Sequence, residues 1–343
     1  MARLKLALAG DTMLGRTVAL RLAIAPPASL FASEVVDIAH EADVFLLNLE
    51  CAISARGRPW PDPFKPFFFR APPAAVDVLC HLGVDCVNLA NNHALDFGTD
   101  ALLDTLEHLA AAGIATVGAG ADRRAARAPA IIERGGTSLG IVGVTDHPPD
   151  FAASRDRPGV AYADLRHGVP HWLIHRVAEL RTDVVVATAH WGPNMVPAPV
   201  AHVRAAAADL RRAGAMLVAG HSAHVFHGVD DAVLYDLGDF IDDYAVHPVL
   251  RNDRGLFFLV TLDDGHAVRV EAVPLALDFC QTRLADPEEA RWIADRFRRA
   301  CAAFGTEVVE RNGRLVIEPR GSRSDPRERS GRRRRQPASA SRG

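Results

Sequence analysis

Five apolar segments of this sequence end in side chains that can bind a metal ion or transfer a proton. They are "LKLALAGD" with Asp11, "VFLLNLE" with Glu50, "CVNLANNH" with Asn92 and His93, "VVVATAH" with His190, and "MLVAGHSAH" with His221 and His224. In parallel α/β sheets, ligands bind beyond the carboxyl ends of the strands. We therefore expect these carboxylates, amides and imidazoles to meet at one edge and to form a shared metal site.

The donor types restrict the metal. Oxygen and imidazole ligands without thiolate suit Mn, Fe, Zn or a related divalent ion, rather than a structural zinc. A carboxylate that bridges would allow two ions, which together activate water and hold a transferring group. These residue types do not distinguish Mn, Zn, Fe, Mg and Ca, nor one ion from two.

The segments that must position these side chains alternate with helical patterns, which predicts an α/β fold with largely parallel strands. Strands are predicted at 4–9, 44–49, 85–90, 115–118, 138–144, 184–189 and 215–219, and helices near 32–42, 73–82, 100–112, 171–181 and 200–213. Asp100 is expected to cap the third of these helices.

Beyond residue 220 the pattern changes to strands with short connections, at 224–226, 231–237, 255–263 and 267–276. We expect these strands to form an antiparallel portion of a second sheet. A further helix is predicted at 287–304, with Asp286 as its N-cap and Pro287 at its first position.

The chain of 343 residues divides into three predicted parts. Residues 1–278 form the main domain, residues 279–318 a C-terminal helix and short extension packed on it, and residues 319–343 a disordered Arg-rich tail. Residues 320–343 carry nine arginines and two acidic residues, a charge of +7, and subtracting this from the net −3 leaves −10 for the remainder. We expect this tail to be solvated and expect no nucleic-acid partner; the sequence does not set the oligomeric state.

Cysteine content and hydropathy predict the compartment. The five cysteines are odd in number and form no C-x-x-C pair, which is typical of free thiols in a reduced cytoplasm. The N-terminal apolar run is interrupted by Asp11 and is too short for a signal peptide, and no stretch approaches the ~18 apolar residues of a membrane span. We expect a cytoplasmic protein without a membrane span or N-terminal anchor.

Several motifs together resemble the CapA family of poly-γ-glutamate capsule synthesis proteins, within the calcineurin-like metallophosphatase superfamily. They are "GDTMLGR" (10–16), "NLE" (48–50), "FRAPP" (69–73), "NLANNHALDFG" (88–98), "HWG" (190–192), "GHSAHV" (220–225) and "YDLGDF" (235–240). The resemblance covers about residues 4–275 and implies a four-layer αββα sandwich of the metallo-dependent phosphatase type, with metal at the strand ends.

The resemblance also implies roles for individual residues. By position, the metal ligands are Asp11, Glu50, Asn92, His190, His221 and His224. His93 resembles the catalytic histidine of the superfamily and is expected to act as an acid/base, with Asp96 orienting it. The opening Asp11-Thr12-Met13 departs from the usual Asp-x-His, so one metal position loses a ligand.

Four more residues are candidates for substrate binding. Arg70 can bind a phosphate or carboxylate, or else stack on the neighbouring phenylalanines. Trp191 can wall a pocket or simply pack, and His227 can be a site histidine or a surface turn residue. Asp239, in "LGDF", can add a carboxylate at the rim or belong to a polar turn.

These observations favour a metal-dependent hydrolase that acts on a phosphoester, or on an amide of an anionic, γ-glutamyl peptide-like substrate. Asp11 and His93 would carry the chemistry with a metal-activated water. Two alternatives remain: a metal-dependent peptide epimerase on the same fold, and a non-catalytic protein that binds or assembles the capsule polymer.

Overall fold

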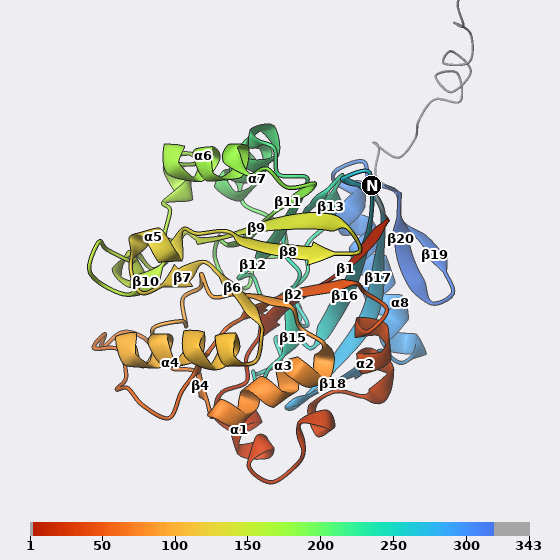
Figure 1. The fold of residues 1–343 in the computed structure, drawn as a ribbon. Helices are drawn as coiled ribbons and strands as arrows, with labels where there is room; N and C mark the ends of the chain where they lie inside the picture. The colour runs from red at the N-terminus through yellow and green to blue at the C-terminus, as the bar shows by residue number, and fades with distance from the viewer. Residues whose placement is uncertain (1–2, 319–343) are drawn as a thin grey trace, which may run out of the picture.

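Two β-sheets pack face to face between layers of helices (Figure 1). The computed structural model describes residues 3–318. The predicted tail at 319–343 lies outside the described residues. This arrangement confirms the α/β class and the four-layer αββα sandwich.

The larger sheet contains ten strands in the order β19-β20-β17-β16-β1-β2-β5-β6, with β15 also paired to β1 and β18 to β17. Their bounds are β1 (Leu4–Thr12), β2 (Val44–Leu49), β5 (Cys86–Asn88), β6 (Ala115–Val117), β15 (Asp239–Ile241), β16 (Arg254–Asp263), β17 (His266–Asp278), β18 (Gln281–Leu284), β19 (Val309–Arg311) and β20 (Arg314–Ile317). Strands β1, β2, β5 and β6 run parallel, whereas β16 is antiparallel to both β1 and β17.

The smaller sheet contains six strands in the order β13-β14-β12-β11-β9-β8. Their bounds are β8 (Ala130–Arg134), β9 (Thr137–Thr145), β11 (Val184–His190), β12 (Leu217–His221), β13 (Val229–Asp230) and β14 (Val233–Leu234). Two short pairs lie outside the main sheets: β3 (Ala52–Ile53) with β4 (Arg70–Ala71), and β7 (Ala119–Gly120) with β10 (Gly159–Val160). Because β9, β11 and β12 run parallel, their carboxyl ends lie at the same edge.

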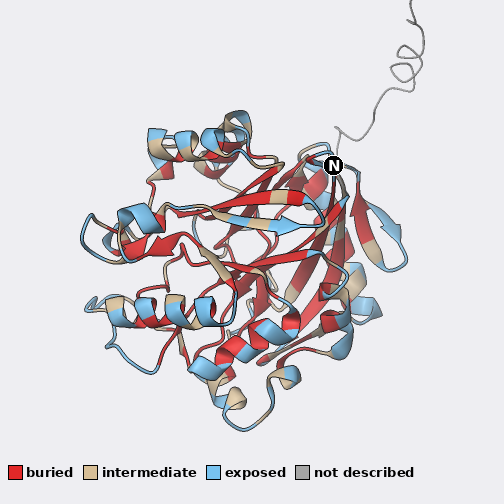
Figure 2. Ribbon diagram, viewed as in Figure 1, coloured by how far each residue is buried: buried red, intermediate tan, exposed pale blue. Residues whose placement is uncertain are grey.

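Helices cover the outer face of each sheet. The α-helices are α1 (Arg16–Leu22), α2 (Ser33–Ala39), α3 (Val76–Leu82), α4 (Gly98–Ala111), α5 (Arg123–Ala126), α6 (His171–Glu179), α7 (Ala201–Ala213) and α8 (Pro287–Ala302). Helices α2, α3 and α4 share a core with the ten-stranded sheet, and α6 and α7 share one with the six-stranded sheet. The outer surfaces of these helices are exposed and their inner surfaces are buried (Figure 2).

The alternation of side chains along β1 shows why the fold has four layers. Leu4, Leu6 and Leu8 point into the core between the two sheets, whereas Ala7 and Ala9 face the helices. Side chains two residues apart share one face of a strand, so both faces of β1 must be apolar when both are covered. The small alanines on the outer face leave room for the helices.

Most predicted elements are present, and the corrections have physical reasons. The predicted strand at 224–226 is wrong, because Val225 and Phe226 are buried in a loop. The prediction that 255–263 and 267–276 belong to a second sheet is also wrong: β16 pairs with β1 and extends the first. Helix α4 begins at Gly98, so Asp100 lies in its first turn and is not its cap. Helix α1 is too short for its periodicity to be detected.

The C-terminal segment joins the main body through both sheet pairing and core contacts. Strand β18 pairs with β17, and β20 also pairs with β17. The buried side of α8, which includes Ile293, Phe297 and Cys301, belongs to the core between the sheets. The division of the chain at residue 278 stays a prediction. Among the described residues, no helix combines the length and apolar character needed to cross a membrane.

The start of α8 provides a test of local stability. The Asp286 side chain accepts hydrogen bonds from the backbone N–H groups of Glu288 and Glu289, and Glu289 reaches back to the Asp286 N–H. We expect Asp286→Ala to lower the free energy of unfolding by about 1–2 kcal/mol, since these helix-end donors would lose their partners. Urea denaturation measures this. The control is Asp295→Ala, an exposed aspartate of the same helix, for which an equal loss would contradict the capping role.

Candidate metal centre and adjoining cavity

Strand register places a row of polar side chains across the buried edge of the ten-stranded sheet. Asn88 of β5 lies beside Asn48 of β2, Asn48 lies beside Asp11 of β1, and Asp11 lies beside Asp239 of β15. The row is connected by hydrogen bonds. The Asn88 amide donates to Asn48 Oδ1 at 2.9 Å, and the Asn48 amide donates to Asp11 Oδ1 at 2.7 Å. The orientation of Asp11 is therefore set by its neighbours before any ligand binds.

The pairing of β1 with β15 requires a close backbone approach. The Asp11 N–H donates to the Gly238 carbonyl at 2.9 Å. A Cβ atom on Gly10 would lie 1.7 Å from that same carbonyl oxygen, so only glycine fits there. The glycines of "GDT" and "LGD" thus let the strands carrying Asp11 and Asp239 lie side by side.

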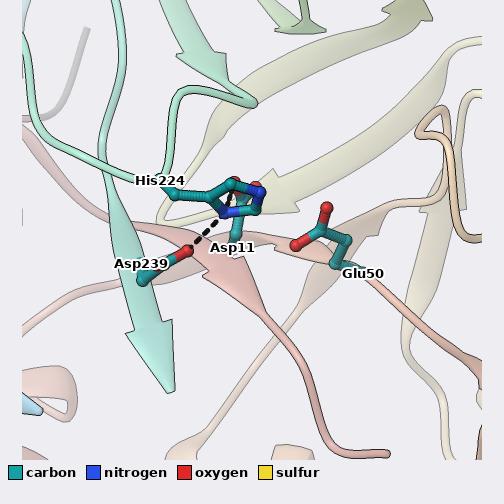
Figure 3. A group of neighbouring side chains, drawn as sticks. All are labelled: Asp11, Glu50, His224 and Asp239. Carbon is teal, nitrogen blue, oxygen red and sulfur yellow. Dashed lines mark hydrogen bonds and ion pairs between the residues drawn. The ribbon is translucent and has the colours of Figure 1, made fainter. Parts of the chain in front are cut away.

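Three carboxylates and one imidazole come together at this edge (Figure 3). Asp11, Glu50, His224 and Asp239 each offer a ligand atom, and these atoms lie within 4.8 Å of one another. His224 Nδ1 lies 2.8 Å from Asp239 Oδ1 and 3.3 Å from Asp11 Oδ2. All four residues are buried. The sequence left Asp239 either at the rim of the site or in a polar turn, and the structure instead places it inside the cluster.

The loop after β12 brings His224 to the cluster through a strained backbone. Ser222 has a φ of 109° and His224 a φ of 59°, a region that costs side-chain-bearing residues on the order of 1–3 kcal/mol each. The turn aims the Ser222 N–H at Asp11 Oδ2 and the Ala223 N–H at Asp236 Oδ2. Buried Asp236 thus acts as an anchor for the loop that carries the imidazole.

Burial of like charges perturbs every group in the cluster. Desolvation raises the pKa of Asp11 to about 7 and raises the pKa values of Glu50 and Asp239 well above their usual range. Burial lowers the pKa of His224, but Asp239, Glu50 and Asp11 outweigh it, and the net pKa is well above normal. The site is therefore short of positive charge, which is a condition that a bound cation relieves.

The six-stranded sheet supplies two more histidines at matching positions. His190 ends β11 and His221 ends β12, and the two are paired in the parallel register. His190 Nδ1 lies 3.8 Å from Asp11 Oδ1, which places this imidazole beside the cluster. Burial lowers the pKa of His221 to about 3, and burial together with neighbouring histidines lowers that of His190.

Unpaired atoms indicate what the site can hold. Within residues 3–318, the following buried atoms lack a hydrogen-bond partner: Glu50 Oε1, Asn92 Oδ1, His190 Nε2, His221 Nδ1 and Asp239 Oδ2. Buried polar atoms are rarely left unpaired without a functional reason. They are oxygen and imidazole donors of the kind that divalent ions prefer. The residues present therefore fit a divalent metal; the individual ligand roles stay predictions.

His93 lies beside the cluster with one ring nitrogen held and the other facing the carboxylates. Its Nδ1–H donates to Asp96 Oδ2 at 2.6 Å, while its Nε2 lies 3.9 Å from Glu50 Oε1. Asp96 also accepts the Phe69 N–H and forms an ion pair with Lys65. Burial lowers the pKa of His93 to about 4, partly offset by Asp96, so the ring is neutral at neutral pH.

A cavity of about 520 Å³ opens directly above His93 and His224. Its walls are largely apolar or aromatic and include Phe67, Phe69 and Tyr244, with Arg16 on one side. The Phe69 ring stacks on the imidazole of His93 with 3.9 Å between ring centres. A cavity of this size beside a cluster of perturbed groups is typical of a small-molecule or peptide site.

Residues 5–244, which contain the whole cluster, match the family described as bacterial capsule synthesis protein PGA_cap. The chain belongs to this family.

Two relatives and one solved structure illustrate the similarity. The chain is 35% identical to a "Probable polyglutamine synthesis accessory protein" of Mycobacterium tuberculosis over 80% of this chain and 76% of the relative. It is 32% identical to the "PGA biosynthesis protein CapA" of Bacillus subtilis over 49% of this chain and 45% of that protein. A 5'-nucleotidase precursor from Thermus thermophilus aligns with a TM-score of 0.43 and 15% identity, over 84% of this chain and 55% of that one.

Three of the candidates for substrate binding lie outside the lining of this cavity in the PGA_cap family member. Arg70 stacks on Phe97 with its guanidinium carbon 4.2 Å from the ring centre, and it does not line the cavity above His93. Trp191 is buried in the core beneath α7 and donates its indole N–H to the Tyr235 carbonyl. His227 is buried, not a surface residue, and donates from Nε2 to the Val196 carbonyl.

Several residues of the PGA_cap site escaped sequence reasoning. Asn48 lies inside the "NLE" motif, and its position two residues before Glu50 in an apolar strand was the available signal. Asn91 had no assigned role; its amide donates to the Leu49 carbonyl, and its Oδ1 accepts the His93 N–H. Arg16 is the last residue of "GDTMLGR", so the sequence identified its motif but not the direction of its side chain.

Removal of one carboxylate tests the metal centre. We expect Asp239→Asn to weaken divalent-metal binding at least tenfold, because the site loses a negative oxygen donor while its shape is kept. Metal content by inductively coupled plasma mass spectrometry, with Mn²⁺ and Zn²⁺ titrations, measures this. Asp104→Asn is the matched control, since Asp104 is a buried aspartate that binds Ser54 and Arg56 outside the cluster. Equal metal content in both variants would contradict the assignment.

Proposed function

We propose that this protein is a metal-dependent hydrolase that cleaves an amide bond in an anionic, glutamyl peptide-like substrate. The observation that carries the proposal is the His93–Asp96 pair: Nδ1 is held at 2.6 Å, and Nε2 faces Glu50 at the floor of the cavity. Such a pair is how proteins position a general base. The names of the relatives, which refer to polyglutamine and capsule polymer synthesis, support a glutamyl substrate.

Asp11, Glu50, His224 and Asp239 are the residues that would hold the divalent ion, with Asn92, His190 and His221 as further donors. When bound, such an ion supplies Lewis acidity, which polarises a carbonyl and acidifies a water molecule.

His93 would perform both proton transfers. Nε2 accepts a proton from water as its oxygen forms a bond with the amide carbonyl carbon, and it later donates that proton to the leaving nitrogen as the C–N bond breaks. Asp96 accepts the Nδ1–H throughout, so it keeps the tautomer in which Nε2 has a free lone pair. Stacking on Phe69 fixes the plane of the ring.

The cavity lining favours an amide over a phosphoester. Among its lining residues, Arg16 is the one arginine or lysine, and it already pairs with Asp243. A phosphate dianion is normally bound by several arginine or lysine side chains. The aromatic walls instead suit the aliphatic body of a peptide with a single carboxylate.

Substitution of the base tests the proposal. We expect His93→Gln to lower kcat for hydrolysis of γ-glutamyl peptides by about 10²- to 10⁴-fold, while the amount of bound metal stays unchanged. Asp96→Asn should lower it at least tenfold. The control is His175→Gln, because His175 is an exposed residue of α6.

The same assay separates the rival functions. Run in deuterated water, it detects epimerisation as deuterium at Cα without cleavage, and phosphoesters offered in parallel detect phosphatase activity. Either result alone would replace the proposed reaction. Binding of the polymer without any turnover would make the protein a non-catalytic assembly factor.

A further inference from the structure

Arg16 lines the cavity and has an unusual backbone conformation. Its φ is 49°, at the start of α1, and the next N–H, that of Thr17, donates to Asp243 Oδ2 at 2.9 Å. Asp243 Oδ1 lies 3.2 Å from Arg16 Nη2. One buried carboxylate thus fixes both the backbone turn and the direction of the guanidinium, which is how a protein holds a long side chain in one place.

Three aromatic rings surround the guanidinium. Its carbon lies 5.4 Å from the centre of Phe67, 5.6 Å from Phe69 and 5.9 Å from Tyr244. These distances are within the range of a cation–π interaction. Among the described residues, Asp243 is the one ion-pair partner of the side chain, whereas a guanidinium has five N–H donors. The side chain is 35% exposed and lines the cavity, so a ligand there can reach it.

We infer that Arg16 is the specificity-determining residue of this site, and that it binds a free substrate carboxylate four bonds from the amide carbonyl that is cleaved. The ligand class is a glutamyl unit with its second carboxylate unblocked. The position of the cleaved bond rests on the proposed function, while the carboxylate subsite rests on the geometry of Arg16 alone.

The Phe69 ring lies near both Arg16 and His93, the two ends of the site. The ring contacts Arg16 on one side of the cavity and stacks on His93 at its floor. The guanidinium carbon and the imidazole centre are therefore no farther apart than 5.6 Å and 3.9 Å laid end to end. A carboxylate carbon bound to arginine lies about 4 Å from the guanidinium carbon. Four C–C bonds of about 1.5 Å span about 5 Å when extended, so a glutamyl unit bound at Arg16 is long enough to extend towards His93.

The surroundings strengthen such a contact. Phe67, Phe69 and Tyr244 shield part of the guanidinium from water, and a charge-assisted hydrogen bond gains strength where the dielectric is low. Asn194 and Asn252 also line the cavity and offer amide donors. A carboxamide in place of the carboxylate would lose the charge. It would also place an NH₂ donor, which the guanidinium cannot bind, where one carboxylate oxygen had accepted.

Equilibrium binding tests the inference without requiring turnover. The probes are tri-γ-glutamate and the same peptide with its α-carboxylates converted to carboxamides, titrated calorimetrically into the full chain. We expect the wild type to bind the acid form at least tenfold more tightly. Arg16→Gln should raise Kd for the acid form roughly 10- to 100-fold and leave Kd for the carboxamide form unchanged. Arg16→Lys, which keeps the charge but not the fork, should fall between.

Matched arginines provide the controls. Arg127→Gln replaces an arginine that stacks on Trp172 away from the cavity, and its Kd values should equal those of the wild type. Arg70→Gln replaces the arginine that stacks on Phe97. Loss of acid-form binding in Arg70→Gln instead of Arg16→Gln would overturn the assignment. So would equal wild-type affinity for both probes, or equal loss of both in Arg16→Gln.

The two proposals fail separately. Discrimination between the probes that depends on Arg16, without cleavage of either, would remove the hydrolase proposal and keep the carboxylate subsite. Cleavage of both probes with the same KM in wild type and Arg16→Gln would do the reverse. Thermal denaturation of each variant shows whether the fold is intact, and the ratio of the two Kd values is insensitive to a partly unfolded fraction.

Discussion

The register of β1 against β15 is the constraint on which the site depends. It sets Asp11 and Asp239 side by side in a buried edge, where two like charges repel and neither is hydrated. Burying such groups costs several kcal/mol each unless they are compensated. The compensation comes from every side: the Asn48 amide, the Ser222 N–H and the His224 imidazole all face Asp11. Glu50 adds a third carboxylate, so these donors do not balance the charge, whereas the divalent ion that we propose for this site would.

The two sheets contribute different chemistry to that balance. The ten-stranded sheet delivers carboxylates and amides, and the six-stranded sheet delivers imidazoles, with His190 and His221 paired in register. The strained loop that carries His224 joins the two sets, and Asp236 holds it by accepting two backbone N–H groups. Strain of this kind persists only where surrounding contacts determine it completely. The close approach at Gly10 shows that the backbone, too, is shaped to keep the cluster together.

Sequence patterns predicted which strands end at this edge but not how short segments cross it. The apolar runs before Asp11, Glu50 and His190 were long enough to identify, and their alternation with helices predicted the α/β class. The four-layer sandwich was implied by the resemblance to the CapA family. Strand β15 has three residues and no period to detect, so the sequence did not place Asp239 beside Asp11. The direction of an arginine depends on tertiary neighbours: Arg16 and Arg70 both follow apolar residues, yet Asp243 turns one into the cavity and Phe97 holds the other outside it.

An aromatic seam connects the charged ends of the site. Phe69 touches His93, Tyr244 and Arg16, and Tyr244 also reaches Glu50 with its hydroxyl at 3.5 Å. A rigid ring between a base and a cation fixes their separation better than flexible side chains, because a ring has no internal torsions to lose. The Phe69 N–H bond to Asp96 helps to position the ring that lies near both Arg16 and His93. Since Asp96 also holds the His93 ring, one carboxylate positions both the base and the aromatic ring beside it.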